Sequence, residues 1–388
     1  MNKTFLIIFS LIGNILFAQN KEIKGVVLDI ETNEKIAFVS IYQKNKNGEE
    51  KFGIMSNEKG EFILTVQNET IEVIFSHINY KTEKIKIEDL IKKPLAKLVV
   101  NNVRLDEVKI TNTSPKTILK NAVENSSRKA DKNILLNSYS REITKINDQY
   151  ENISDAMIDF YVNKKNGSSK LVVNQSRAFV KDTVKLKKSL SVFDVRKFVK
   201  NAYDFNLIKK IANSKNYEFQ IQDQSNDNDK EFQNIKIIPK KEIQEMLYEG
   251  YAIIDTKNNT IAEIKLQSSK YHKEFAKYAN VILFEMRINN TIEWSKFRTI
   301  DDKYILVYNK DGLEISFKMK DETAKDYVLN ATCDIFIQDF RENVTVPQET
   351  YNKKSIFQSG TKYTEEYWKQ IKSYPFTEEE QNFIQSFN

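Results

Sequence analysis

The chain has 388 residues, which is enough for two or three domains with cores of their own. Hydrophobic residues make up 40% and aromatic residues 11%, with only 9 glycines and 5 prolines, which excludes a fibrous or low-complexity protein. The 60 basic and 54 acidic residues are interspersed and leave a net charge of +6. Because no dense Lys/Arg block with interleaved aromatic residues occurs, we expect no nucleic-acid partner.

The first residues have the layout of a secretory signal peptide. Lys3 supplies a positive charge, an apolar run covers 5–17, and the small residue Ala18 precedes the polar Gln19. The run is too short for a membrane-spanning helix, so we expect a signal peptide over 1–18 and no integral membrane span after cleavage. No cysteine directly follows the expected cleavage site after Ala18, so we expect no lipoprotein attachment.

The only cysteine of the chain, Cys333, excludes an intramolecular disulfide bond. It lies in an alternating segment, 327–337, on a strand face that is mostly apolar. We therefore predict a buried structural thiol and not a reactive nucleophile.

Residues 22–110 predict a β-sandwich, because short alternating segments follow one another with tight connections and no intervening helix. Gly60 is expected to provide the positive φ of a hairpin. The predicted strands are 24–29, 37–42, 52–56, 61–66, 71–76, 84–87, 98–100 and 103–110.

Four segments of this region, 25–29, 36–41, 56–62 and 75–81, resemble the carboxypeptidase regulatory-like domain in sequence and spacing. Asn79 departs from the family, which usually has glycine before the aromatic residue. The resemblance implies a transthyretin-like or Ig-like β-sandwich of the kind common at the N-termini of Gram-negative envelope proteins. It implies no catalysis.

A helical linker is predicted over 111–136. Ser114 and Pro115 form a helix start signal. An apolar stripe then continues the helix to Asn125. The stripe consists of Ile118, Leu119, Ala122 and Val123.

Residues 137–345 predict a larger antiparallel α+β domain, which makes the whole chain mainly β with a few helices. A helix is expected at 192–203, with Val195, Phe198 and Tyr203 on its apolar side. Residues 257–259 are a good turn. The predicted strands are 137–146, 150–162, 217–221, 232–238, 249–255, 260–266, 281–288, 293–300, 304–308, 313–319 and 327–336.

The hairpin that crosses Asp255 resembles the curved sheet of outer-membrane lipoprotein-carrier folds, over residues 137–340. The layout of the whole chain is also similar to envelope proteins of unassigned function that carry the regulatory-like module. The tail, 346–388, is expected to be helical, with a capping box at 377–380 and Phe383 available for docking. These resemblances imply a periplasmic or outer-membrane-associated protein that is secreted across the inner membrane.

The two histidines do not support a zinc enzyme. A catalytic zinc needs about three protein ligands, with His prominent among them. His77 and His272 lie in different predicted domains; we expect His77 at a strand end and His272 facing solvent. There is no Gly-x-Ser-x-Gly elbow and no Gly-rich phosphate loop, so we expect no catalytic residue, cofactor or metal.

Two acidic patterns remain. Asp223-x-Ser225-x-Asp227-x-Asp229 alternates like a calcium loop but lacks its glycine and its final glutamate, so we interpret it as a solvated hairpin tip. Asp155 and Asp159 share one strand face, with Arg141 or Glu142 as partners. Paired carboxylates can perform acid–base chemistry. We expect these two on the solvent-exposed face of a sheet.

The sequence therefore favours a non-enzymatic cell-envelope recognition or scaffold protein, in which sheet edges or faces dock another envelope component. One alternative is a periplasmic carrier of a lipid or other hydrophobic ligand, which would need a continuous apolar concave face. A hydrolase is a weaker alternative. The expected partner is an envelope protein or a lipid component, and the oligomeric state stays open.

Overall fold

The computed structural model describes residues 21–66, 69–77, 79–100, 113–130, 133–163, 169–181, 192–227, 230–300, 303–320, 325–360, 368 and 374–387. The expected signal peptide and the expected strand at 103–110 lie outside these residues. The chain forms two compact units. One comprises Met1–Val100 with Lys369–Thr377, and the other Asn101–Trp368 with Glu378–Asn388.

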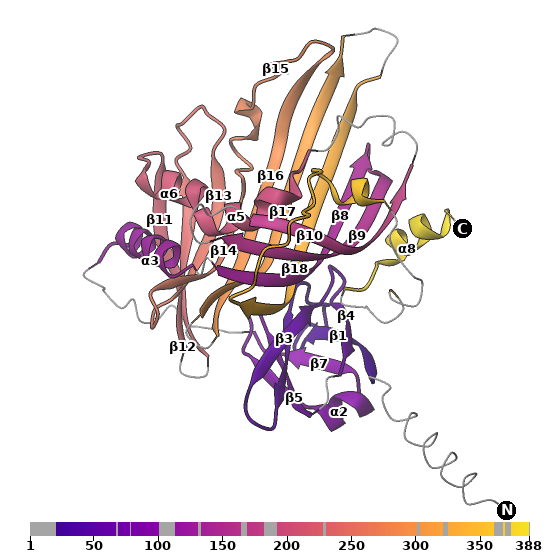
Figure 1. Cartoon of the computed structure of the whole chain (residues 1–388). Coiled ribbons are helices and arrows are strands. Elements are labelled where there is room, and N and C mark those ends of the chain that lie inside the picture. Colours follow the sequence, from indigo (N-terminus) through magenta and orange to yellow (C-terminus); the bar gives the residue numbers. More distant parts are fainter. Residues whose placement is uncertain are drawn as a thin grey trace, which may run out of the picture. The chain divides into compact units, whose positions relative to one another are not determined.

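The first unit is a β-sandwich with two sheets, of order β4-β1-β7 and β3-β2-β5-β6 (Figure 1). Its core is formed by apolar residues of both sheets, among them Val27, Ile41 and Phe75. The strands are β1 (Glu22–Asp29), β2 (Ser40–Asn45), β3 (Glu50–Met55), β4 (Glu61–Thr65), β5 (Thr70–Ser76), β6 (Glu83–Lys86) and β7 (Leu95–Leu98).

One expectation for this unit is confirmed and one is wrong. Gly60 has a φ of +69°, and a Cβ there would approach the carbonyl oxygen of Val27 to 2.9 Å, so this turn needs glycine. The sandwich is not free of helices, because α2 (Ile87–Lys92) stands between β6 and β7. Its Leu90 is fully buried in the core. The alternation that ends at Ile87 resembles a strand, but Leu90 and Ile91 follow at helical spacing.

The second unit is built on an antiparallel sheet of 11 strands, which confirms the mainly β class with few helices. The order is β10-β9-β8-β18-β17-β16-β14-β13-β12-β11, and β15 pairs with β16. The strands are β8 (Asn133–Ile146), β9 (Gln149–Asn163), β10 (Ser169–Val180), β11 (Tyr217–Asp227), β12 (Lys230–Pro239), β13 (Tyr248–Asp255), β14 (Thr260–Ser268), β15 (Ala279–Asn280), β16 (Phe284–Ile300), β17 (Lys303–Met319) and β18 (Tyr327–Glu342).

Two pairs of expected strands are single long strands. Residues 284–288 of the first segment and all of 293–300 belong to β16, and a bulge between Ile288 and Asn290 lies between them; residues 281–283 precede the strand. The segments 304–308 and 313–319 belong to β17. The Asp311-Gly312 pair resembles a turn in sequence, but both residues stay in register with β16 on one side and β18 on the other.

The helices of this unit lie against the sheet (Figure 1). The first helix begins as predicted, since Ser114 accepts a hydrogen bond from the Thr117 N–H. Among the helices in the described ranges, none is long and apolar enough to cross a membrane. The α-helices are α3 (Pro115–Lys129), α5 (Val195–Asp204), α6 (Asn206–Asn213) and α8 (Glu378–Gln385), and the 3₁₀ helices are η3 (Lys273–Phe275) and η4 (Ile356–Ser359).

The strand register sorts the side chains of the large sheet onto two faces. We call one the cleft face. Its central cross-strand row is Leu266, Glu293, Asp311, Cys333 and Glu142. The other is the ladder face, and its row, one residue away on each strand, is Lys265, Trp294, Lys310, Asp334, Arg141, Asp155 and Arg177.

Candidate functional site

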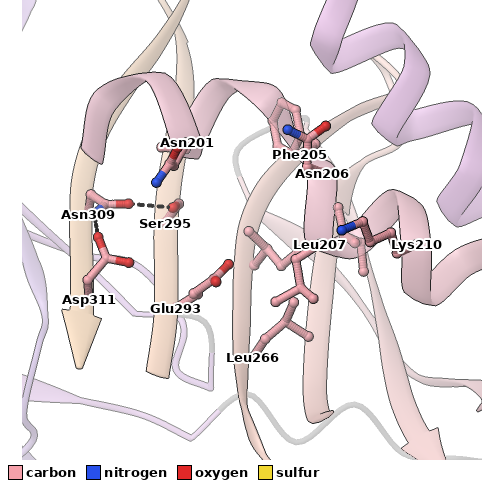
Figure 2. Close-up of a pocket in the computed structure, with 13 residues that line it drawn as sticks. Asn201, Phe205, Asn206, Leu207, Lys210, Leu266, Glu293, Ser295, Asn309 and Asp311 are labelled. Carbon is pink, nitrogen blue, oxygen red and sulfur yellow. Dashed lines mark hydrogen bonds between the residues drawn. The ribbon is translucent and has the colours of Figure 1, made fainter. Parts of the chain in front are cut away.

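A cleft of about 240 Å³ lies between the α5–α6 junction and strands β14, β16 and β17, on the cleft face (Figure 2). Its walls come from Asn201 and Leu207 of the helices and from Leu266, Glu293 and Asp311 of the strands. Small-molecule sites are typically about 300–1,000 Å³, so this cleft matches a small ligand or the head of a larger one.

The helical wall is held in place by aromatic contacts. Phe205 joins α5 to α6 in a left-handed conformation with a φ of 52°, which turns the chain between the two helices. The Phe205 and Phe297 ring centroids are 5.3 Å apart. Tyr203 accepts a hydrogen bond of 2.7 Å from the Leu306 N–H of β17. These contacts fix the junction over the sheet.

The floor of the cleft carries two carboxyl groups on neighbouring strands. Glu293 of β16 and Asp311 of β17 are direct cross-strand partners. The Asn309 amide nitrogen donates to Asp311 Oδ2 at 2.7 Å, and the Asn309 amide oxygen accepts from the Ser295 hydroxyl at 2.8 Å. Figure 2 shows this chain of hydrogen bonds beside Glu293. The Ser295 hydroxyl thereby orients the amide that holds Asp311.

Both carboxyl groups are harder to ionise than usual. Burial raises the pKa of Asp311 to about 7, against the hydrogen bond from Asn309 and with a further contribution from the Glu293 charge. Burial also raises the pKa of Glu293. In the part of the chain that the structure describes, no Lys or Arg lies within 4.0 Å of either carboxylate. A bound cation or hydrogen-bond donor would therefore relieve the unfavourable ionisation.

The remaining wall is mixed, because it carries the aliphatic Leu207 and Leu266 as well as the polar Asn201 and Asn206 and the basic Lys210. Leu266 precedes the carboxyl pair in the cross-strand row, and Leu207 projects from α6 above it (Figure 2). The cleft is therefore amphipathic, with the carboxyl pair on its floor and both aliphatic side chains and Lys210 in its lining. It suits a ligand that joins a hydrogen-bond-donating or cationic head to a short apolar part. Within the described ranges, His, Cys, Asp and Glu form no cluster of three or more that could hold a metal ion.

The expected position of His272 is wrong. Its side chain is fully buried, and both ring nitrogens have partners: Nδ1 lies 3.0 Å from the Ser269 hydroxyl and Nε2 donates to the Lys240 carbonyl at 3.1 Å. Its neighbour Tyr271 is the exposed residue of this segment. His77 directly follows β5, which confirms its place at a strand end.

The expected solvent exposure of Asp155 is also wrong. Asp155 is only 1% exposed and accepts from Arg141 Nε at 2.9 Å and Arg177 Nη2 at 2.7 Å, so the predicted partner Arg141 is confirmed. Burial alone would raise the pKa of Asp155, but the two arginine charges outweigh it and lower the pKa. Asp159 stands four residues further along β9, about 13 Å away, and accepts from Asn137. The two do not form an acid–base pair.

Other predicted residues fall as expected or outside the described side chains. Cys333 is buried, 1% exposed, as predicted. The backbone of Asp223, Ser225 and Asp227 pairs with β12, whereas their side chains and the whole of Asp229 lie outside the described residues. Trp368 and Phe383 are buried, and the Phe383 ring packs 5.6 Å from Tyr150, which confirms that the terminal helix docks. Ile371 lies outside the described residues.

Sequence reasoning missed the two cleft residues Glu293 and Asp311. Glu293 stands between Ile292 and Trp294. The alternation of polar and apolar residues in this segment predicts a strand, but it does not predict which residue of the neighbouring strand lies opposite Glu293. Asp311 precedes Gly312, and this pair resembles a turn in sequence, so Asp311 was not predicted to lie within a strand. Only the register of β16 with β17 brings them together.

Residues 23–110 match the family model of the CarboxypepD_reg-like domain, which confirms the first resemblance. No curated protein matches the chain. Similar solved structures include a DUF1329 family protein from Desulfovibrio piger, at 9% identity and TM-score 0.29, covering 61% of this chain and 96% of that one. A LolA superfamily protein from Nitrosomonas europaea, at 10% identity and TM-score 0.23, has the same coverage. At TM-scores this low, neither likeness carries an argument about this chain.

Proposed function

We propose that this chain is a non-enzymatic recognition protein of the cell envelope, and that its cleft binds a small amphiphile through a cationic or hydrogen-bond-donating head. The observation that carries the proposal is the carboxyl pair Glu293 and Asp311. The pair has raised pKa values and no basic partner in the described residues, and it faces the aliphatic Leu207 and Leu266. Residues 1–18 and the CarboxypepD_reg-like match at 23–110 support an envelope location, in the periplasm or at the outer membrane.

The other reactive groups support a binding role over catalysis. Burial raises the pKa of the Cys333 thiol well above its ordinary value, so the nucleophilic thiolate does not form near neutral pH. Both nitrogens of His272 are engaged, and Asp155 is held between two arginines. None of these three groups is available as a general base or nucleophile.

A carrier of a larger hydrophobic ligand is the second candidate, because the cleft face continues as an apolar surface beyond the carboxyl pair. From Asp311 the same face of β17 continues with Leu313, Ile315 and Phe317, opposite Ile288 and Met286 of β16. Ile315 and Phe317 are buried, 2% and 4% exposed, so an acyl chain with its head in the cleft would have to displace the groups that cover them. Native mass spectrometry of the full chain purified from cell envelopes tests this, since a retained lipid mass supports the carrier.

Two probes with matched tails test the head-group preference: n-octylamine and n-octanoate, titrated into the full chain by calorimetry near neutral pH. We expect the amine to bind and the carboxylate not to bind, because only the amine offsets the charge of Glu293 and Asp311. The double variant Glu293→Gln/Asp311→Asn should weaken amine binding about tenfold or more. Glu218→Gln, on the exposed side of β11, is the control and should bind the amine like the wild type. Equal binding of both probes, or an unchanged double variant, overturns the proposal.

A further inference from the structure

The turn between β15 and β16 exposes its largest apolar side chains to solvent. Val281 and Phe284 close it with two hydrogen bonds, of 2.8 and 3.3 Å between N–H and carbonyl groups. Ile282 and Leu283 stand at the centre, 90% and 70% exposed. The ends of β16 and β17 carry this turn past the helices (Figure 1). We call residues 281–283 the apolar tip.

Local turn chemistry does not explain these residues. Tight hairpin turns favour Asn, Asp and Gly, which tolerate positive φ and hydrogen-bond locally. Neither Ile282 nor Leu283 has a positive φ, and Ile is β-branched, so its conformational preference favours strands. A pair of exposed apolar side chains at a protruding turn therefore indicates a contact with something outside this unit.

The ribbon behind the tip is apolar on one face and aromatic. Phe284 pairs with Met319, and Met286 pairs with Phe317, on the same face of the ribbon. The ring centroids of Phe284 and Phe317 are 5.2 Å apart, and those of Phe317 and Tyr327 are 4.7 Å apart. The apolar surface thus continues from the tip along the ribbon, and an aromatic layer stands directly behind the tip.

Basic side chains flank the other face of the ribbon. Lys318 Nζ lies 4.3 Å and the Arg287 guanidinium 5.0 Å from the centre of the Tyr278 ring. Lys320 stands beside the tip, since its N–H donates to the Leu283 carbonyl at 3.3 Å. The acidic groups nearby are Glu285, opposite Lys318, and Asp326, which accepts from the Met319 N–H. Asp321 and Glu322 follow in sequence, outside the described residues.

We propose that the apolar tip inserts into the interfacial region of a lipid bilayer. A stable protein interface buries about 800 Å² on each partner, which a protruding turn of two residues does not supply. A bilayer accepts a few apolar side chains, places aromatic rings at the level of the head groups, and leaves lysine and arginine heads in the aqueous layer. Lys320 stands beside the tip, and Lys318 and Arg287 lie on the opposite face of the ribbon, level with the aromatic layer and just behind it. The inference is independent of the ligand in the cleft.

Flotation of the full chain with vesicles tests this proposal. The vesicles contain phosphatidylethanolamine and phosphatidylglycerol at about three to one, with a parallel set of pure phosphatidylcholine. We expect the wild type to float with both sets and more strongly with the anionic one. Ile282→Ser/Leu283→Ser should weaken binding to both sets about tenfold or more, because the apolar contact is lost. Lys318→Gln/Lys320→Gln should remove only the preference for anionic vesicles.

Ile71→Ser is the matched control, because Ile71 is an exposed β-strand residue of the other unit, and it should float like the wild type. All these side chains are exposed, so the variants should unfold at the wild-type temperature, which circular dichroism verifies. The proposal is overturned if the wild type floats with neither vesicle set. It is equally overturned if Ile282→Ser/Leu283→Ser binds as strongly as the control.

Discussion

The central rows of the two faces of the large sheet lie one residue apart on each strand. The carboxyl groups of one row have basic partners, whereas those of the other row have none in the described residues. On the ladder face, Asp155 lies between Arg141 and Arg177, and Asp334 accepts from the Tyr308 hydroxyl at 2.6 Å. Lys310 Nζ also lies 3.5 Å from Asp334. On the cleft face, Glu142, Glu293 and Asp311 have no basic partner in the described residues.

The pKa directions follow this difference. Arginine charges lower the pKa of Asp155 despite its burial, whereas burial raises the pKa of Asp311 and of Glu142 to about 7. Glu142 accepts a hydrogen bond of 2.7 Å from the Ile356 N–H, which favours its charged form but does not offset the burial. The ladder face thus holds compensated charges that stabilise the fold. On the cleft face, Glu293 and Asp311 line the cleft, where a ligand could compensate their charge, whereas Glu142 is buried outside it.

The largest effect should come from breaking the ladder face. Asp155→Ala removes the carboxylate shared by Arg141 and Arg177 and leaves the fully buried Arg141 with the more distant carboxylate of Glu380, 3.5 Å from its Nη1. We expect a loss of about 3–5 kcal/mol in the free energy of unfolding, measured by urea denaturation near neutral pH. Because the folded-state pKa of Asp155 is lowered, this stabilisation exists above the unfolded-state value, about 3.9, and is lost as the pH falls further.

Asp159→Ala is the control on the same strand, since it removes only the hydrogen bond with Asn137, and should lose about 1 kcal/mol. If Asp155→Ala loses no more than this control, the arginine pair does not depend on Asp155.

A smaller effect of opposite sign is expected at Glu142. Its folded-state pKa of about 7 lies above the unfolded-state value, so stability falls as the pH rises from about 4 to about 7. Glu142→Gln keeps an acceptor for the Ile356 N–H and removes this penalty. We expect the variant to gain about 1–2 kcal/mol at about pH 8 and nothing at about pH 4, measured by thermal unfolding.

Glu142→Ala removes both the charge and the acceptor of the Ile356 N–H, whereas Glu142→Gln removes only the charge. Comparing the two variants separates the two contributions to stability. Glu142→Ala should be less stable than Glu142→Gln at both pH values. A gain that is the same at both pH values would contradict the titration of Glu142.

The smallest stability effect should come from Asp311 in the open cleft. Its folded-state pKa is also raised to about 7, so Asp311→Asn should stabilise the chain at about pH 8 and not at about pH 4. Solvent reaches this carboxyl, so we expect only about 1 kcal/mol. Thermal unfolding across this pH range measures it, and a destabilised variant at about pH 8 would show that the Asp311 charge is compensated within the chain.

Local patterns of the sequence predicted most strands and caps. The Ser114 cap, the turn at 257–259 and the paired strands that include 137–146 all form as expected. Alternation also gave the correct face relations of Asp155 and Asp159. Alternation did not predict the solvent exposure of Asp155 correctly. A period of two separates side chains onto two faces of a strand, but it does not show whether other segments cover a face. Asp155 and His272 are both buried by segments distant in sequence.

The sequence by itself determined the β-rich class, the regulatory-like match at 23–110 and the burial of Cys333, because each depends on neighbouring residues or on a spacing within one segment. The tertiary structure alone decided which charges are compensated. Glu293 meets Asp311 and Arg141 meets Asp155 through the register of separate strands. A shift of one residue in that register would exchange the two faces, and local sequence does not specify which segments will cover them.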